Sequence, residues 1–179
     1  FDVDGTLAET EEVHREAFNT VFEQAGLGWY WSPEEYCELL KVFGGKERMR
    51  HFVETESIDG ISDEDILELH RLKTSLYADL LPRTAELRPG VERLIEECLS
   101  RSVRLAIATT TTESNVDALD RAVGGSLRLG AFHVVVGGNT VWQKKPDPKV
   151  YQTTLEKLGL EPAEAIAIED ASAGVQAAR

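Results

Sequence analysis

The chain begins FDVDGTL, which places two aspartates, Asp2 and Asp4, one residue apart and directly before a glycine. Side chains alternate along a β-strand, so both carboxylates point the same way if the strand persists to Asp4. Gly5 allows the chain to turn sharply after them. Two carboxylates held this close repel each other, so the pair needs a shared proton or a bound cation. The alternative interpretation is an acidic turn that follows a strand.

Three later segments carry polar residues of complementary types. The apolar run VRLAIAT ends at Thr109, Lys145 stands before Pro146 ahead of an expected helix, and IAIED ends in Glu169 and Asp170. Each of these residues alone is commonly a turn, cap or solvated residue. Sites in parallel α/β sheets gather at the carboxyl ends of strands, so together they predict one shared site. Its carboxylates suit Mg²⁺, and its hydroxyl and ammonium suit a phosphate.

The elements that position these residues follow from hydrophobic spacing. Helical spacing predicts helices over residues 10–25, 33–42 and 46–54, and a fourth that Ser62 caps and that ends before Pro82. After Pro89 the chain alternates between helical stretches (91–99, 114–123, 148–160 and 171–179) and strand-like stretches (103–109, 132–138 and 164–170). Together with residues 1–3 as a first strand, this alternation predicts a parallel sheet covered on both faces.

The expected fold is therefore α/β. Residues 1–9 and 84–179 form a Rossmann-like, doubly wound parallel sheet, and residues 10–83 form an all-helical domain inserted after the first strand. The chain begins with Phe and stops inside an expected helix. We therefore expect both termini to be truncated and the sheet to be incomplete at its edge. On that interpretation, this segment expressed alone is marginally stable or inactive.

Composition narrows the possible partners. The chain has 32 acidic and 19 basic residues and a net charge of −13, which argues against non-specific binding to nucleic acid or to an anionic membrane. No apolar run approaches the roughly 20 residues that span a bilayer. Cys37 and Cys98 lie far apart, which favours a reducing compartment without a zinc site. We expect a monomer in a bacterial cytoplasm, with the chloroplast stroma as the alternative for a plant or alga.

The motifs DVDGTL, Thr109, Lys145-Pro146 and Glu169-Asp170, in this order and spacing, resemble the four motifs of the haloacid dehalogenase superfamily. The stretches LAIATTTTESNVDAL, AETEEVHREAFN, GGKERM and KKPDPKVY are similar to those of the CbbY proteins within it. CbbY proteins are phosphatases that remove a phosphate from xylulose 1,5-bisphosphate, an inhibitor of Rubisco. β-Phosphoglucomutases and phosphoglycolate phosphatases are near relatives. The resemblance also implies that the helical insert is a cap domain.

The resemblance implies a role for each core residue. Asp2 attacks phosphorus and becomes an aspartyl-phosphate, and Asp4 acts as general acid and then as general base. Thr109 and Lys145 hold the phosphoryl oxygens. The implied ligands of the Mg²⁺ cofactor are Asp2, the backbone carbonyl of Asp4 and Asp170, with Glu169 assisting directly or through water.

The cap of such enzymes closes over the core and contacts the rest of the substrate, which for a bisphosphate includes a second phosphate. The candidate substrate-binding residues are Glu11, Glu12 and His14 near the hinge, the cations Lys46, Arg48 and Lys73, and Thr110 beside Thr109. Each has an alternative interpretation as a solvated or packed residue of a helix. The aromatic run from Trp29 to Trp31 favours packing within the cap over stacking on a sugar.

Three classes of function fit these residues. The first is a Mg²⁺-dependent sugar-phosphate phosphatase whose favoured substrate is xylulose 1,5-bisphosphate. The second is a β-phosphoglucomutase-like mutase, and a phosphoglycolate phosphatase is a related alternative. The core motifs are common to these enzymes, so only the cap separates them, and the resemblance there favours the phosphatase. The third is a non-catalytic phospho-acceptor such as a signalling receiver domain, which the long helical insert argues against.

Overall fold

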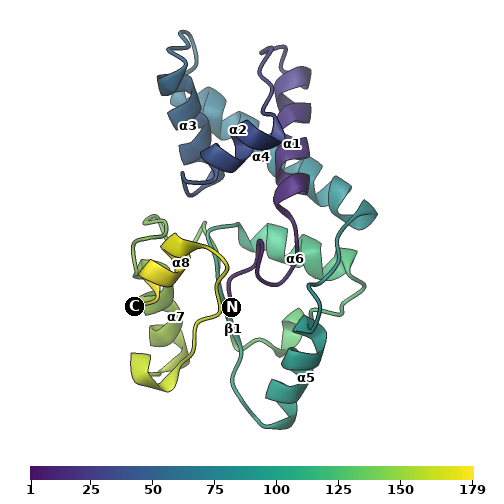
Figure 1. The fold of residues 1–179 in the computed structure, drawn as a ribbon, viewed down its shortest axis with the longest axis vertical. Coiled ribbons are helices and arrows are strands. Elements are labelled where there is room, and N and C mark those ends of the chain that lie inside the picture. The colour runs from purple at the N-terminus through teal and green to yellow at the C-terminus, as the bar shows by residue number, and fades with distance from the viewer. The chain divides into compact units, whose positions relative to one another are not determined.

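The computed structural model describes residues 1–179, which separate into two compact units (Figure 1). One unit consists of residues 1–10 together with 82–179, and the other consists of residues 11–81. The first contains the only β-sheet, and the second is helical throughout. Each unit has its own set of buried apolar side chains.

The helical unit contains four α-helices: α1 (Glu11–Gln24), α2 (Pro33–Leu39), α3 (Gly45–Thr55) and α4 (Asp63–Leu80). They confirm the four helices expected from the sequence, although α2 ends three residues before the expected limit at residue 42. Local signals set the starts of two of them. Ser32 and Ser62 each accept a hydrogen bond from the backbone N–H three residues later, and the carboxylate of that later residue accepts one from the backbone N–H of the serine.

Aromatic side chains form the core of the helical unit. Trp31 and Phe22 are fully buried, Phe18 and Tyr36 nearly so, and the Trp31 ring centroid lies 4.8 Å from the centroids of both Phe18 and Phe22. Met49 of α3 is fully buried in the same cluster. For Trp31 this burial confirms packing within the unit. Such rings remove a large apolar area from water, which stabilises a unit of this small size.

The α/β unit contains the remaining elements, which are α5 (Val91–Ser100), β1 (Ala106–Ala108), α6 (Glu113–Ala122), β2 (Val134–Val136), α7 (Lys149–Leu158) and α8 (Ser172–Ala177), with short 3₁₀ turns at Leu81–Arg83, Leu129–Ala131 and Pro162–Glu164. β1 and β2 pair in parallel, with Ala106 opposite Val134. Figure 1 draws α5 and α6 on one side of β1 and α7 and α8 on the other. This arrangement agrees with the parallel α/β fold expected from the sequence.

Two of the four expected strands, residues 1–3 and 164–170, do not form strand elements. Phe1 nevertheless bonds to β1, since its ammonium donates to Ala106 O at 2.9 Å and its carbonyl accepts from Ala108 N at 2.8 Å. Asp2 N donates to Ile168 O at 3.1 Å. Residues 1–2 therefore lie between β1 and residue 168, with too few hydrogen bonds on either side to build a ladder.

None of the helices in this structure combines the length and the apolar character that a membrane span requires.

Replacement of Ser62 by Ala tests how far the capping box stabilises the helical unit. Loss of the side-chain acceptor leaves the Asp65 N–H of α4 without its cap, so we expect the free energy of unfolding to fall by about 1 kcal/mol. Urea unfolding followed by tryptophan fluorescence measures this, because Trp29 and Trp31 lie in this unit. Exposed Thr84, replaced by Ala, is the control. Equal midpoints for the two variants would show that the cap contributes nothing.

Candidate active site

The first loop holds its two aspartates on a tight turn. Val3 O accepts hydrogen bonds from Thr6 N at 3.2 Å and Leu7 N at 2.8 Å, so the chain reverses direction directly after Asp4. Gly5 has φ +76°, a conformation that residues with a side chain rarely adopt. A Cβ at Gly5 would also overlap the Asp170 carboxylate. The glycine therefore serves both the turn and the close approach of an acid from the far end of the chain.

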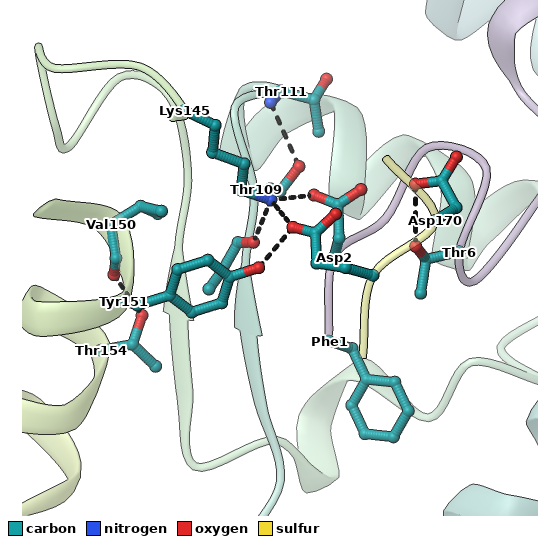
Figure 2. A network of polar contacts seen from close by, with 12 residues as sticks. Phe1, Asp2, Thr6, Thr109, Thr111, Lys145, Val150, Tyr151, Thr154 and Asp170 are labelled. Carbon is teal, nitrogen blue, oxygen red and sulfur yellow. Dashed lines mark hydrogen bonds and ion pairs between the residues drawn. The ribbon is translucent and has the colours of Figure 1, made fainter. Parts of the chain in front are cut away.

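Lys145 is the centre of a buried polar network (Figure 2). Its ammonium donates to Asp2 Oδ1 at 2.6 Å, to the carbonyl of Ala108 at 3.1 Å and to Glu169 Oε1. An ammonium has three N–H groups, so these three acceptors use all of them. The network thus joins four segments that are far apart in the sequence, and it brings together three of the residues predicted for the site.

The Asp2 carboxyl has an unusual proton affinity. Burial raises its pKa to about 7, with the charge of Lys145 opposing the shift and the charge of Glu169 adding to it. A buried carboxylate loses its hydration, which disfavours the charged form. In the absence of a cation the group therefore titrates near neutral pH.

Three carboxylates form the candidate metal centre. Asp2, Glu169 and Asp170 each offer an oxygen, and these oxygens lie within 4.8 Å of one another. Thr6 Oγ1 donates to Asp170 Oδ1 at 3.2 Å, which orients that carboxylate. A Cβ at Gly174, in the first turn of α8, would overlap the Glu169 carboxylate. A cluster of hard, negatively charged oxygens in this space fits Mg²⁺.

The Asp4 side chain is not part of that carboxylate cluster. Its Oδ1 accepts a hydrogen bond from the hydroxyl of Thr10, which is fully buried. The two aspartates of the first motif therefore have different surroundings. Asp2 contacts a lysine and lies among acids, whereas Asp4 is oriented by a hydroxyl, and this difference suits two different chemical roles.

Thr109 directly follows β1 and is buried. Its backbone N–H donates to Val136 O at 3.0 Å, and its hydroxyl accepts from Thr111 N at 3.2 Å. Thr110 is half-buried beside it. A Cβ at Gly138 would overlap the Thr110 carbonyl, so the loop after β2 packs closely on the run of threonines. This packing sets the position of the loop that leads to Lys145.

Glu11 and Arg48 form hydrogen bonds within the helical unit. Glu11 accepts from the Tyr36 hydroxyl at 3.2 Å, and Arg48 donates to the same hydroxyl at 2.9 Å. Arg48 also donates to Leu39 O at 3.0 Å and is buried. These contacts tie α1, α2 and α3 together. The substrate-binding role predicted for both residues stays a prediction.

His14 and Lys73 are buried together in the same unit. The His14 ring stacks on Tyr77 with centroids 4.0 Å apart, and Lys73 Nζ contacts His14 Nδ1. Lys73 Nζ also lies 4.7 Å from the centroid of the Phe18 ring. Both residues were predicted from the sequence to bind substrate, and the structure places them side by side.

The remaining two candidates of the helical unit lie nearer its surface. Glu12 forms an ion pair with Arg15 on α1, and Lys46 is half-buried in the first turn of α3. A substrate-binding role for either stays a prediction.

Sequence reasoning missed several residues that the structure places at this site. They are Thr6, Thr10, Tyr151 and Gly174, of which Tyr151 donates its hydroxyl to Glu169. Thr6 belongs to the first motif, so its position two residues after Asp4 was an available signal. Thr10 and Gly174 lie only six and five residues after their partners Asp4 and Glu169, and the turn between each pair brings them together. Tyr151 lies 18 residues before Glu169, and no local pattern indicates that partner.

The family model described as haloacid dehalogenase-like hydrolase matches residues 1–179. Protein CbbY of Rhodobacter capsulatus is 50% identical over 180 residues, which covers 100% of this chain and 79% of that protein. Protein CbbY of Cereibacter sphaeroides is 44% identical, with coverage of 100% and 78%. Beta-phosphoglucomutase of Bacillus subtilis is 27% identical, with coverage of 99% and 76%.

Two solved structures are similar over nearly the whole chain. CbbY from Rhodobacter sphaeroides in complex with phosphate has a TM-score of 0.91 and 44% identity, and the match covers 99% of this chain and 79% of that one. A variant of that protein in complex with xylulose 1,5-bisphosphate has a TM-score of 0.91 and 43% identity, with the same coverage.

The raised pKa of Asp2 predicts how Mg²⁺ binding depends on pH. The pKa of Asp2 is higher in the folded, metal-free protein than in the unfolded chain, so protonation of this carboxyl stabilises the fold. This contribution to the free energy of unfolding is lost as pH rises through about 7. Protons therefore compete with Mg²⁺ below that pH, so we expect its apparent affinity to fall, approaching about tenfold per unit of pH. Calorimetric titration with Mg²⁺ between pH 8 and pH 6 measures it. A constant affinity over that range would contradict the assignment.

Replacement of Gly174 by Ala tests the space around Glu169. The new methyl group displaces the carboxylate, which ends a flexible side chain, so we expect the fold to remain and Mg²⁺ affinity to fall about tenfold or more. Gly130→Ala is the matched control, because a Cβ there meets nothing within 4 Å. Calorimetry and thermal melting are measured for both. Equal Mg²⁺ affinity in the two variants would show that Glu169 takes no part in binding the ion.

Proposed function

Because this chain belongs to the haloacid dehalogenase-like hydrolases and is a phosphatase, we propose that it removes a phosphoryl group from a sugar phosphate through an aspartyl-phosphate. The observation that carries this proposal is the buried contact of Lys145 with Asp2, beside Glu169 and Asp170. This contact supports the proposal, because a carboxylate that is to act as nucleophile needs a cation and a metal-binding set of acids beside it.

We propose xylulose 1,5-bisphosphate as the favoured substrate. Similarity to the CbbY proteins extends over the whole chain, and a CbbY variant was crystallised with this compound. The helical unit would act as the cap that contacts the sugar and the second phosphate. Lys46 and Lys73 are its candidate cations. The Arg48 guanidinium bonds to Tyr36 and to the backbone, and Lys73 is buried against His14, so either would have to exchange a contact to bind the phosphate.

In the first half-reaction, the Asp2 carboxylate attacks phosphorus and the bond from phosphorus to the sugar oxygen breaks. Asp4 donates a proton to the leaving oxygen, so the sugar departs as a neutral alcohol. The hydrogen bond from Thr10 keeps the Asp4 carboxyl in one orientation for this transfer. Asp2 now carries the phosphoryl group.

In the second half-reaction, a water molecule attacks the phosphorus of the aspartyl-phosphate. Asp4, which lost its proton in the first step, accepts one from this water. The bond between phosphorus and the Asp2 oxygen breaks, which releases inorganic phosphate and restores both aspartates.

Lys145 and Thr109 would hold the phosphoryl oxygens during both steps. The three N–H groups of Lys145 are all engaged in this structure, so the ammonium must exchange one acceptor for a phosphoryl oxygen. Positive charge there stabilises the transition state, in which negative charge lies on the equatorial oxygens. Mg²⁺ bound by Asp2, the Asp4 carbonyl, Glu169 and Asp170 would supply further positive charge.

A substrate screen tests this function. The full-length protein with Mg²⁺ is assayed for release of inorganic phosphate from sugar mono- and bisphosphates, and we expect the highest kcat/KM for xylulose 1,5-bisphosphate. Asp2→Asn removes the nucleophile, so we expect turnover to fall at least about a thousandfold. Binding of the substrate to this variant, measured by calorimetry, is the control for folding.

The same screen separates the alternatives. Interconversion of glucose 1-phosphate and glucose 6-phosphate without release of phosphate would identify a mutase. A protein that accepts a phosphoryl group on Asp2 but does not turn over would be a phospho-acceptor. Either result would overturn the proposal. Compartment and oligomeric state stay predictions, with a monomer in a bacterial cytoplasm preferred.

A further inference from the structure

Tyr151 lies in the first turn of α7, and its side chain reaches the same network as Lys145 (Figure 2). Its hydroxyl donates to Glu169 Oε1, the oxygen that also accepts from Lys145 Nζ. Its ring centroid lies 5.3 Å from that Nζ. One tyrosine therefore contacts both a candidate metal ligand and the candidate phosphate-binding cation.

Glu169 Oε1 accepts hydrogen bonds from both Tyr151 and Lys145, so the positions of these three side chains depend on one another. Glu169 is 3% exposed at its side chain, so its carboxylate depends on partners within the protein. A carboxylate can only accept, so the Tyr151 hydroxyl is the donor in this contact. Lys145 has no N–H to spare, which means that it must release an acceptor before it can bind a phosphoryl oxygen.

The effect of releasing an acceptor depends on which of its three acceptors Lys145 releases. Asp2 gains a new bond to phosphorus, and Ala108 O is a neutral carbonyl, whereas Glu169 would be left as a buried anion with one partner fewer. A buried charge without partners is strongly destabilised. The hydroxyl of Tyr151 is a second donor already in place at the same oxygen, so Glu169 stays bonded when Lys145 moves away.

We propose that Tyr151 is a positioning residue of the phosphatase reaction, which holds the Glu169 carboxylate while Lys145 exchanges that carboxylate for a phosphoryl oxygen. The ring supports the same step, because its face lies beside the ammonium and limits where Nζ can go. This inference rests on the roles proposed above for Lys145 and Glu169, and it adds a residue that none of the four motifs contains.

Replacement of Tyr151 by Phe tests the role of the hydroxyl, since it removes one oxygen and keeps the ring. We expect kcat for the best substrate of the screen to fall about tenfold while KM stays within about twofold. We expect the Kd for Mg²⁺, measured by calorimetry without substrate, to rise about threefold to tenfold. Tyr151→Leu also removes the ring, so its kcat should fall further.

Thr154→Val is the matched control, because it removes another buried hydroxyl from the same helix. Thr154 Oγ1 donates to Val150 O at 2.7 Å and contacts nothing in the network. We expect wild-type kcat and Mg²⁺ affinity in this variant. If Tyr151 only packed the helix, Tyr151→Phe and Thr154→Val would behave alike in both measurements, with any loss matched by a lower melting temperature.

The measurements distinguish failure of this inference from failure of the proposed function. A wild-type protein that releases phosphate, together with a Tyr151→Phe variant of equal kcat and equal Mg²⁺ affinity, would overturn only the role of Tyr151. A wild-type protein that releases no phosphate would overturn the proposed function, and with it the step that Tyr151 is said to support. A kcat defect with unchanged KM and weaker Mg²⁺ binding, absent from Thr154→Val, would support the inference.

Discussion

The burial of one ammonium group is the constraint on which the site depends. Removing a lysine charge from water costs several kcal/mol unless acceptors replace the lost hydration. Lys145 finds them on Asp2, Ala108 and Glu169, which come from three other segments. A displacement of any one segment would leave the buried ammonium with one acceptor fewer. The same contact that would do the chemistry therefore also keeps residues 1–2, the end of β1 and residue 169 in register.

Space for the acids is made by residues that have no side chain. Gly5 and Gly174 lie where a Cβ would overlap the carboxylates of Asp170 and Glu169. Thr6 and Tyr151 then supply hydrogen bonds that orient those acids. A dense set of like charges is thus held in place by hydroxyls and by an ammonium, an arrangement that a divalent cation would stabilise further.

The proposed catalytic residues and most of the candidate substrate-binding residues lie in different units, a division that suits a phosphatase. All the residues proposed for bond making and breaking lie in the α/β unit, and most of the candidates for substrate choice lie in the helical unit. The helical unit has an independent aromatic core around Trp31, and several of its polar candidates also bond within it. On this proposal, variation there would change the substrate without disturbing the carboxylates, so the core motifs alone would not separate a phosphatase from a mutase.

The sequence by itself determined the features that depend on neighbours in the chain. Capping at Ser32 and Ser62, the helical spacing of apolar residues, and the acids, threonine and lysine at expected strand ends are all local signals. Only the tertiary structure decided that residues 1–3 and 164–170 form no strands, and that Tyr151 joins the site. The reason is physical: a ladder or a buried hydrogen bond needs a partner that folding alone brings within reach, and no local pattern encodes that partner's position.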